Sequence, residues 1–168
     1  GLETTVNVVP VIACKLPEGV DITNLSELSE AGGDLRLAAP ADFATSVPLG
    51  AGVLSDVYDA TFSEVITTAD DEIAAAIETG DADCGVLSNI DPAMSAQSLV
   101  VLVDDRGAVP PQFVVPLFAT DVATPELLSV LDSATALLND PTVRALLKGT
   151  AIDKITTEVL VSSFLAAK

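Results

Sequence analysis

The sequence predicts an α/β fold, in which a mostly parallel sheet is flanked by helices and followed by a helical carboxyl-terminal tail. Three observations lead to this prediction. Short runs of β-branched and aliphatic residues alternate with segments of helical character through much of the chain. Some of these runs, such as Leu99–Val103, are apolar throughout, which is typical of strands covered on both faces. After residue 118 only helical patterns remain.

The first half of the chain supplies alternating strands and helices with recognisable ends. Thr23 or Asn24 is placed to cap a helix, and Glu27 is placed to complete a capping box. Thr68 is placed to cap a helix with an acidic start, and Gly80 is placed to end it. The expected strands are Val6–Cys14, Leu35–Ala38, Phe62–Ile66 and Ala82–Leu87, and the expected helices are Asn24–Ala31, Pro48–Val57 and Asp70–Glu78.

The second half predicts two further strands and then three helices. Leu99–Val103 predicts a buried strand, and Gln112–Phe118 predicts another, with Phe113 and Phe118 in the core. Thr124 precedes a proline, which is the usual order of a cap and a first helical residue. The expected helices are Pro125–Leu138, Thr142–Lys148 and Thr156–Ala167.

Composition excludes several classes of protein. The chain has 168 residues, enough for one domain or slightly more, and its 49% hydrophobic content and mean hydropathy of +0.53 are those of a folded protein. Seven Lys and Arg stand against 25 Asp and Glu, a net charge of −18, so we expect no nucleic-acid partner. No apolar run approaches the roughly 20 residues of a membrane span. Gly1–Thr5 has the pattern of neither a signal peptide nor a lipid-attachment site, so we expect no signal segment in this chain.

The sequence contains no catalytic constellation. The chain has no histidine, which removes the usual general base and the commonest metal ligand. No serine lies in a Gly-x-Ser-x-Gly motif, and Gly50 and Gly52 form no phosphate-binding loop. We therefore expect a protein that is not an enzyme, with no catalytic residue, no metal and no cofactor.

The two cysteines, Cys14 and Cys84, lie in apolar, strand-like stretches. Neither belongs to a Cys-x-x-Cys motif and no histidine accompanies them, so a zinc site is not expected. Two interpretations remain open. The cysteines either form a disulfide between neighbouring strands or are two small buried hydrophobic residues.

Four elements occur in an order and spacing that resemble a known family. They are Ala39–Phe43, Val57–Phe62, Gly80–Gly85 and the segment from Leu102 through Pro116. Together they resemble the solute-binding proteins of ABC importers for quaternary amines, the glycine betaine and choline class. The resemblance implies a lobe of the periplasmic-binding-protein type II. In that reading residues 1–103 form a lobe-two-like α/β domain, residues 104–168 form the return crossing strand and carboxyl-terminal helices, and the first half of lobe one is lacking.

The resemblance also implies a ligand site in the loops that follow the strands. Parallel sheets bind ligands at the carboxyl ends of their strands, and a quaternary ammonium is usually held by aromatic rings. In the family the residue at position 112 tends to be a cage tyrosine, and an arginine often stands at position 46; here they are Gln112 and Ser46. The residues expected to bind ligand are Asp42, Phe43, Asn89, Asp91 and Gln112.

The residues themselves leave other roles open. Phe43 has an alternative packing role beneath its loop, Asp42 is also suited to cap the following turn, and Asp91–Pro92 is an ordinary helix start. Tyr58 is expected to be a half-buried anchor at a helix end. Asp104–Arg106 is expected to be a solvated turn with a local ion pair.

The function that the resemblance implies is that of an extracytoplasmic solute-binding component of an ABC importer, in the cell envelope or secreted. A small osmolyte or amine would sit between two lobes and close them, and the closed form would dock on the ABC permease subunits. Export would preserve a Cys14–Cys84 disulfide. Because half of one lobe is lacking, we expect the chain alone to bind such ligands weakly or not at all. We also expect that the chain can self-associate through its carboxyl-terminal helices.

Two other classes of function are considered. The first is a one-lobed protein-interaction module without a small-molecule ligand, which an exposed apolar patch would favour. The second is the effector-sensing domain of a transcription regulator, which would be cytosolic and would carry a DNA-binding helix-turn-helix upstream. A Cys14–Cys84 bridge would argue against that cytosolic alternative.

Overall fold

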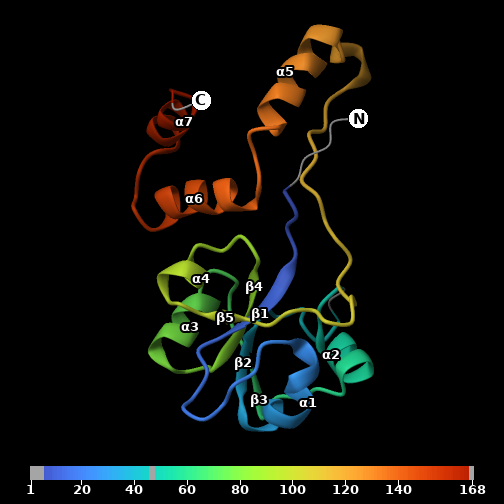
Figure 1. Ribbon diagram of the computed structural model, residues 1–168, viewed down its shortest axis with the longest axis vertical. Coiled ribbons are helices and arrows are strands. Elements are labelled where there is room, and N and C mark those ends of the chain that lie inside the picture. The colour runs from blue at the N-terminus through green and yellow to red at the C-terminus, as the bar shows by residue number, and fades with distance from the viewer. Residues whose placement is uncertain (1–5, 46–47, 167–168) are drawn as a thin grey trace. The chain divides into compact units, whose positions relative to one another are not determined.

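The computed structural model describes residues 6–45 and 48–166, and the predictions for Gly1–Thr5 and Ser46 lie outside the described residues. Contacts within the chain separate two compact units. We call the first the sheet unit, which comprises Val9–Asn89 and Ala93–Pro110. We call the second the helical unit, which comprises the residues through Val8, Ile90–Pro92 and Pro111–Lys168. Figure 1 shows the elements of both units.

The sheet unit contains one five-stranded sheet in the order β3-β2-β4-β1-β5. The α/β prediction is therefore confirmed, with a sheet that is mixed. Strand β2 pairs in parallel with β3 and with β4, whereas β1 is antiparallel to both of its neighbours, β4 and β5. The strands are β1 (Pro10–Cys14), β2 (Arg36–Ala39), β3 (Glu64–Thr67), β4 (Cys84–Ser88) and β5 (Val100–Val101).

Helices cover both faces of this sheet because its central strands are apolar on both sides. In β2, Leu37 and Ala39 belong to one core cluster, while Ala38, which points to the opposite face, belongs to the other. The first cluster is completed by η1 (Leu25–Glu27), α1 (Leu28–Ala31), and α2 (Ala51–Tyr58); η2 (Gly32–Asp34) follows α1. The second cluster is completed by α3 (Ile73–Thr79) and α4 (Ala93–Ala96).

Several helix ends follow from local chemistry. The capping box between Asn24 and Glu27 is present, as predicted. Helix α3 ends at Gly80, whose φ of +81° suits glycine, as predicted. The prediction that Thr68 caps α3 is wrong, because the residues up to Glu72 form a turn and Glu72 occupies the cap position. Thr68 instead donates a hydrogen bond from its hydroxyl to the Glu72 carboxylate, at 3.2 Å.

Two predicted strands of the sheet unit are shorter than expected. β1 begins at Pro10 and not at Val6, because a proline has no N–H for the ladder and is tolerated as a first strand residue. β5 is limited to Val100 and Val101, which are 37% and 38% exposed. The prediction that Leu99–Val103 is a buried strand is therefore wrong for most of its length. The reason is that β5 lies at the edge of the sheet.

The helical unit contains η3 (Thr120–Val122), α5 (Pro125–Thr135), α6 (Asp140–Ala151) and α7 (Thr157–Ala166). Thr124 caps α5 by accepting a hydrogen bond from the Leu127 N–H, as predicted. Helices α6 and α7 pack closely where a Cβ on Gly149 would lie 2.8 Å from the Leu160 side chain. Of the described residues of α5, α6, α7 and η3, only Gly149 is buried.

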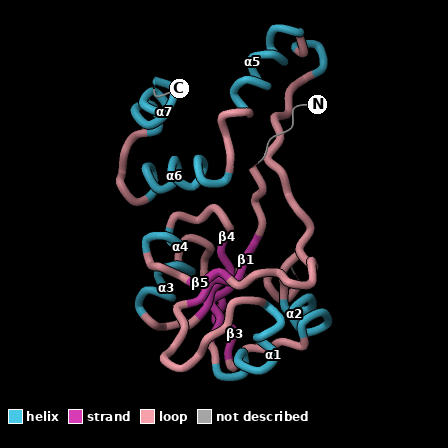
Figure 2. The backbone as a smooth tube through the Cα atoms, viewed as in Figure 1, coloured by secondary structure: helices cyan, strands magenta, loops and turns pink. Residues whose placement is uncertain are grey.

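The predicted strand Gln112–Phe118 is also wrong. This segment makes one isolated bridge, Asn7↔Phe113, and otherwise runs as extended chain (Figure 2). Phe113 is 56% exposed and Phe118 is 36% exposed, so the prediction that they belong to a core is wrong in this structure. Within the part of the chain that the structure describes, the apolar run forms backbone hydrogen bonds with the short segment Val6–Val8, and Pro116 has no N–H to donate.

Candidate functional site

The carboxyl end of the parallel strands brings several of the predicted binding residues together. β2 and β4 are parallel neighbours, so their last residues, Ala39 and Ser88, lie at the same edge of the sheet. The end of β3 lies there as well, since the Thr68 N–H donates to the Ala39 carbonyl at 3.0 Å. The loop of residues 40–45 and Asn89 therefore share the edge at which α/β proteins bind ligands.

Asp42 and Phe43 have different environments within one tight turn. The Phe43 N–H donates to the Pro40 carbonyl at 3.0 Å, and the Thr45 N–H donates to the Asp42 carbonyl at 2.9 Å. The Asp42 side chain is exposed at this edge. Phe43 is 4% exposed and belongs to the core beneath the loop, which is the packing role considered as its alternative. A ligand at this edge therefore meets the carboxylate and not the aromatic ring.

Asn89 holds the beginning of β1 at the same edge. Its side-chain oxygen accepts a hydrogen bond from the Val9 N–H at 2.9 Å, and its own N–H donates to the Val9 carbonyl at 2.9 Å. These two bonds fix the position of Asn89 next to the carboxyl end of β4. The Asn89 side-chain oxygen is thus engaged with the backbone, while the residue itself is half-buried.

Asp91 and Gln112, the other two predicted binding residues, belong to the helical unit. Asp91 is half-buried and stands two residues before α4, where a helix start was the alternative. Gln112 has an exposed side chain, and its backbone pairs with the amino-terminal segment. Its N–H donates to the Asn7 side chain at 2.8 Å and its carbonyl accepts from the Val8 N–H at 2.7 Å. The structure thus brings together Asp42, Phe43 and Asn89 within the sheet unit.

A second polar cluster surrounds Tyr58, at the end of α2. The ring is fully buried, so the residue is an anchor, as predicted, but not a half-buried one. Its hydroxyl donates to the Asp104 carboxylate, and the Arg106 guanidinium lies over its ring, 5.6 Å from the centroid. Burial, followed by the hydrogen bond to Asp104 and its charge, raises the pKa of Tyr58 to about 12.

The prediction that Asp104–Arg106 is a solvated turn with a local ion pair is confirmed only in part: Asp105 and Arg106 form an exposed turn, whereas Asp104 is half-buried. Hydrogen bonds from Ser26, together with the charge of Arg106, lower the pKa of Asp105. Burial by itself would raise the pKa of Asp104, but hydrogen bonds from the Tyr58 hydroxyl and from the Val109 and Ala108 amides outweigh burial, and the pKa is lowered. Nothing local in the sequence indicates this arrangement, because Tyr58 and Asp104 are 46 residues apart.

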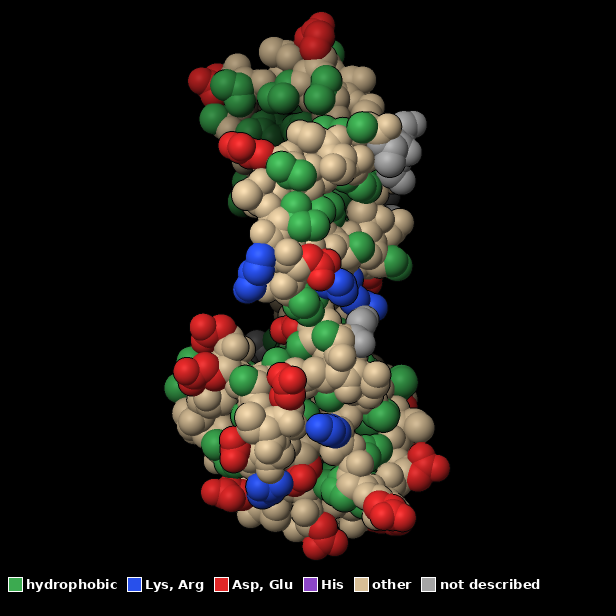
Figure 3. All heavy atoms as spheres, turned by 90° about the vertical axis from the view of Figure 1, so that its left-hand side faces the viewer, with side chains coloured by type: hydrophobic (Ala, Val, Ile, Leu, Met, Phe, Trp, Pro, Cys, Tyr) green, Lys and Arg blue, Asp and Glu red, His purple; other side chains and the backbone are tan. Residues whose placement is uncertain are grey.

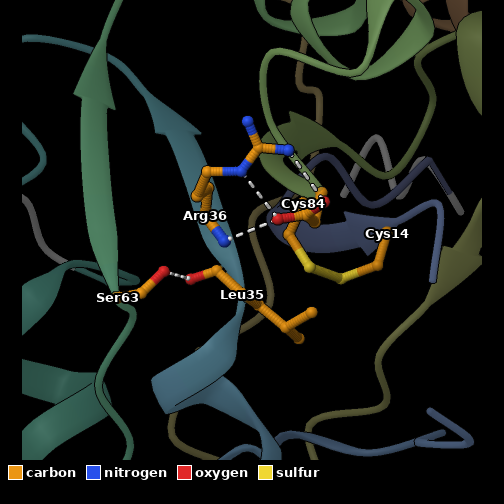
Figure 4. Close-up of a disulfide and its surroundings, with 6 residues drawn as sticks. Cys14, Leu35, Arg36, Ser63 and Cys84 are labelled. Atoms are coloured by element: carbon orange, nitrogen blue, oxygen red, sulfur yellow. Dashed lines mark hydrogen bonds and ion pairs between the residues drawn. A yellow bond between two sulfur atoms is a disulfide. The ribbon is translucent and has the colours of Figure 1, made fainter. Parts of the chain in front are cut away.

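A third cluster lies away from the carboxyl edge, where Cys14, Cys84 and Arg36 come close together (Figure 4) and Arg36 binds Asp83. Cys14 and Cys84 face each other across β1 and β4 and are joined by a disulfide, with their Cα atoms 4.0 Å apart. The Asp83 carboxylate accepts hydrogen bonds from the Arg36 guanidinium at 3.1 Å and from the Arg36 N–H at 2.9 Å. Burial opposes ionisation of Asp83, but the contacts with Arg36 outweigh it and lower its pKa.

A surface hollow of about 360 Å³ lies elsewhere on the sheet unit, lined by residues 19–22 with Glu27, Glu30 and Ala31. None of the predicted binding residues lines it. The Glu27 carboxylate is engaged with the Thr23 and Asn24 amides, which lower its pKa, so it serves the helix cap. Among the described residues no group of three or more His, Cys, Asp or Glu is placed to hold a metal ion.

The comparison with protein families gives one match over most of the chain. A family model described as the substrate binding domain of an ABC-type glycine betaine transport system matches residues 11–167. No curated protein matches the chain. Over the described residues, no helix is long and apolar enough to cross a membrane.

Solved structures show the same fold. The crystal structure of a glycine betaine/carnitine/choline ABC transporter aligns with a TM-score of 0.85 at 18% identity, over 98% of this chain and 62% of that one. Apo YehZ from Escherichia coli aligns with a TM-score of 0.70 at 20% identity, over 98% of this chain and 63% of YehZ. Lactococcal OpuAC, in its closed-liganded conformation complexed with glycine betaine, aligns with a TM-score of 0.61 at 14% identity, over 99% of this chain and 66% of OpuAC. This chain therefore spans less than two thirds of the length of each.

Proposed function

Because the chain belongs to the family of substrate-binding domains of ABC-type glycine betaine transport systems, we propose that it is the extracytoplasmic solute-binding component, or one lobe of it, of an importer for a small quaternary amine. Members of this family are solute-binding proteins and not enzymes, in agreement with the prediction that this chain is not an enzyme. The lobe-like fold that the resemblance implied is the fold of the solved structures above. Residues 1–103 are proposed as the lobe-two-like domain, and residues 104–168 as the return crossing and helical tail.

The ligand is proposed to contact the carboxyl edge of the sheet unit through Asp42. The observation that supports this is the exposed Asp42 carboxylate, in the loop that follows β2 at the carboxyl edge of the parallel strands. A carboxylate attracts a cationic head group, and the net charge of −18 opposes an anionic one. Phe43 is buried and Tyr58 is covered by Arg106, so neither offers an aromatic face at this edge. We therefore propose a ligand with a net positive charge, such as choline, over the zwitterion glycine betaine.

The remaining partners follow from the same proposal. The solute would be handed to ABC permease subunits, and Asp91 and Gln112 are kept as proposed ligand-binding residues. The disulfide between Cys14 and Cys84 is consistent with an oxidising, extracytoplasmic setting. Because the chain spans less than two thirds of the length of its relatives, we propose that the chain alone binds its solute weakly. The dissociation constant would be in the millimolar range, which corresponds to a binding free energy of about −4 kcal/mol.

The test is a titration of the isotope-labelled chain, followed by the amide spectrum, with choline and with glycine betaine at millimolar concentrations. We expect choline to shift the amides of residues 41–45 and Asn89. The variant Asp42→Asn should weaken choline binding at least threefold, while Asp34→Asn, an exposed carboxylate before the start of β2, should not. Absence of shifts at this edge, or equal weakening by both variants, would exclude the proposed contact.

A second candidate function is supported by the surface of the helical unit. Phe113, Val115 and Leu117 are 56%, 55% and 93% exposed, and Val130 and Val159 are 65% and 58% exposed. Figure 3 shows hydrophobic side chains on the surface over the helices. Apolar exposure of this extent marks an interaction surface, so the candidate is a protein-interaction module, including self-association through α5–α7.

Light scattering of the purified chain across a concentration series distinguishes the two candidates. The interaction module predicts a molar mass above 17.1 kDa that falls when Leu117 and Val130 are changed to serine. The solute-binding proposal predicts the choline-dependent shifts whatever the molar mass is. A monomer at all concentrations would count against self-association.

A further inference from the structure

The segment that leaves the sheet, Asp104–Val109, is fastened to the sheet unit by side chains. Before it, Val103 still pairs with the backbone: its N–H donates to Thr23 and its carbonyl accepts from Leu25, both at 2.9 Å. After it stand Pro110 and Pro111, which are exposed and have no N–H. The segment therefore lies between a hydrogen-bonded strand end and a pair of residues that donate no backbone hydrogen bond.

The first fastening is the Asp104 carboxylate. One oxygen accepts from the Tyr58 hydroxyl and from the Ala108 N–H at 3.1 Å, and the other accepts from the Val109 N–H at 2.8 Å. Asp104 thus ties both ends of its own turn to a ring that is fully buried at the end of α2. Gly107, with a φ of +67°, allows the turn to reverse.

The second fastening uses the next two residues. The Asp105 carboxylate accepts from the Ser26 hydroxyl at 2.6 Å and from the Ser26 N–H at 3.1 Å. Arg106 donates to the same hydroxyl at 2.9 Å and to the Val57 carbonyl, and its guanidinium covers the Tyr58 ring. Three consecutive residues therefore bind η1 and the end of α2. We call Ser26, Tyr58 and Asp104–Arg106 the clasp.

The clasp ends where the two units meet in the sequence. Val109 is the last residue held by it, and the division between the units falls between Pro110 and Pro111. The next backbone donor, the Gln112 N–H, bonds to Asn7, which belongs to the helical unit. The only residues between the two sets of hydrogen bonds are thus the two prolines.

We propose that the clasp makes Asp104–Val109 a rigid part of the sheet unit and confines backbone rotation in this connection to Pro110 and Pro111. Proline fixes φ near −65°, so only the ψ angles remain adjustable and the hinge is a restrained one. The use of this hinge in ligand-dependent movement rests on the solute-binding function proposed above, whereas the clasp itself does not.

The test is amide hydrogen exchange of the full chain without ligand, so the result does not depend on whether a solute binds. Tyr58→Phe removes the hydroxyl donor and keeps the ring under Arg106. We expect exchange at Ala108 and Val109 to become about tenfold faster, the equivalent of about 1.4 kcal/mol for the loss of a partly buried hydrogen bond. Ser55→Ala, which removes an exposed hydroxyl from the same helix, should leave these amides unchanged.

A second variant tests the hinge. In Pro110→Gly/Pro111→Gly the connection gains rotational freedom, and the clasp should keep exchange at Ala108 and Val109 at the wild-type rate. The proposal is overturned if Tyr58→Phe leaves these amides unchanged, or if it accelerates the amides of β1 and β2 equally, because that is global destabilisation. Faster exchange at Ala108 and Val109 in the glycine variant would also overturn it.

Discussion

The two units contain similar proportions of aliphatic residues, but the sheet unit buries many of them and the helical unit leaves most of them exposed or half-buried. In the sheet unit the strands and helices enclose two core clusters, and Leu37 is fully buried. In the helical unit Leu117 is 93% exposed, and of its described residues only Val6 and Gly149 are buried. Ordering a residue costs about 1–2 kcal/mol of backbone entropy, which burial must offset. The comparison teaches that apolar content predicts a core only where the chain also supplies the opposing layer.

The largest effect that separates the units is expected from the disulfide. Changing Cys14→Ala/Cys84→Ala removes a cross-link between residues 70 apart, which is worth about 4 kcal/mol by chain-entropy estimates. Both cysteines lie in the sheet unit, so its unfolding midpoint in urea should fall, as followed by amide signals of β1 and β4. Reductant should produce the same change in the wild-type chain and none in the variant. An unchanged midpoint would show that the cross-link does not stabilise this unit.

A matched pair of leucines tests the comparison directly. Leu37→Ala removes a side chain with no exposed surface and should cost about 2–5 kcal/mol in the free energy of unfolding. Leu117→Ala removes an exposed one and should change that free energy by less than about 0.5 kcal/mol. Urea unfolding monitored by circular dichroism measures both. If Leu117→Ala costs as much as Leu37→Ala, the segment 113–118 is covered in solution and the contrast between the units disappears.

The sequence predicts the sheet unit better than the helical unit, because only the sheet unit supplies an opposing layer for its apolar segments. Periodicity, caps and glycine ends are local, so the capping box at Asn24, the stop at Gly80 and the strands β2 and β4 are found near their predicted places. The run Gln112–Phe118 reads as a buried strand, but a buried strand needs neighbouring strands on both sides, and among the described residues the backbone hydrogen bonds of this run go to the short segment Val6–Val8. Local pattern cannot reveal whether a partner exists.

The sequence predicts the polar contacts between distant segments least well. Placing Asp42 after a strand required only the order of the elements, because the ends of parallel strands meet at one edge. The bond from Tyr58 to Asp104 and the covering of its ring by Arg106 join segments 46 or more residues apart. Asp104–Arg106 therefore reads as a solvated turn in the sequence, although its first residue is a half-buried acceptor of hydrogen bonds from Tyr58, Ala108 and Val109. Only the tertiary structure supplies that information.

The smallest effect is expected at alkaline pH and is specific to the sheet unit. The pKa of Tyr58 is raised from its ordinary value of 10.0 to about 12, so above pH 10 the folded state binds the tyrosine proton more tightly than the unfolded state does. The stabilisation is fully present below pH 10, and it is lost as the pH rises through about 12. The loss is on the order of 2 kcal/mol when ionisation is complete.

The measurement is the unfolding free energy in urea between pH 8 and pH 12, for the wild-type chain and for Tyr58→Phe. Both proteins lose stability above pH 10 as lysines deprotonate and net charge grows, and that background is common to them. The difference between them should therefore shrink steadily from pH 10 upward, because only the wild type gives up a phenolic proton on unfolding. A difference that is constant to pH 12 would show that the Tyr58 hydroxyl ionises at the same pH in the folded and unfolded chains. In that case the bond to Asp104 does not hold the proton, and the clasp loses its central contact.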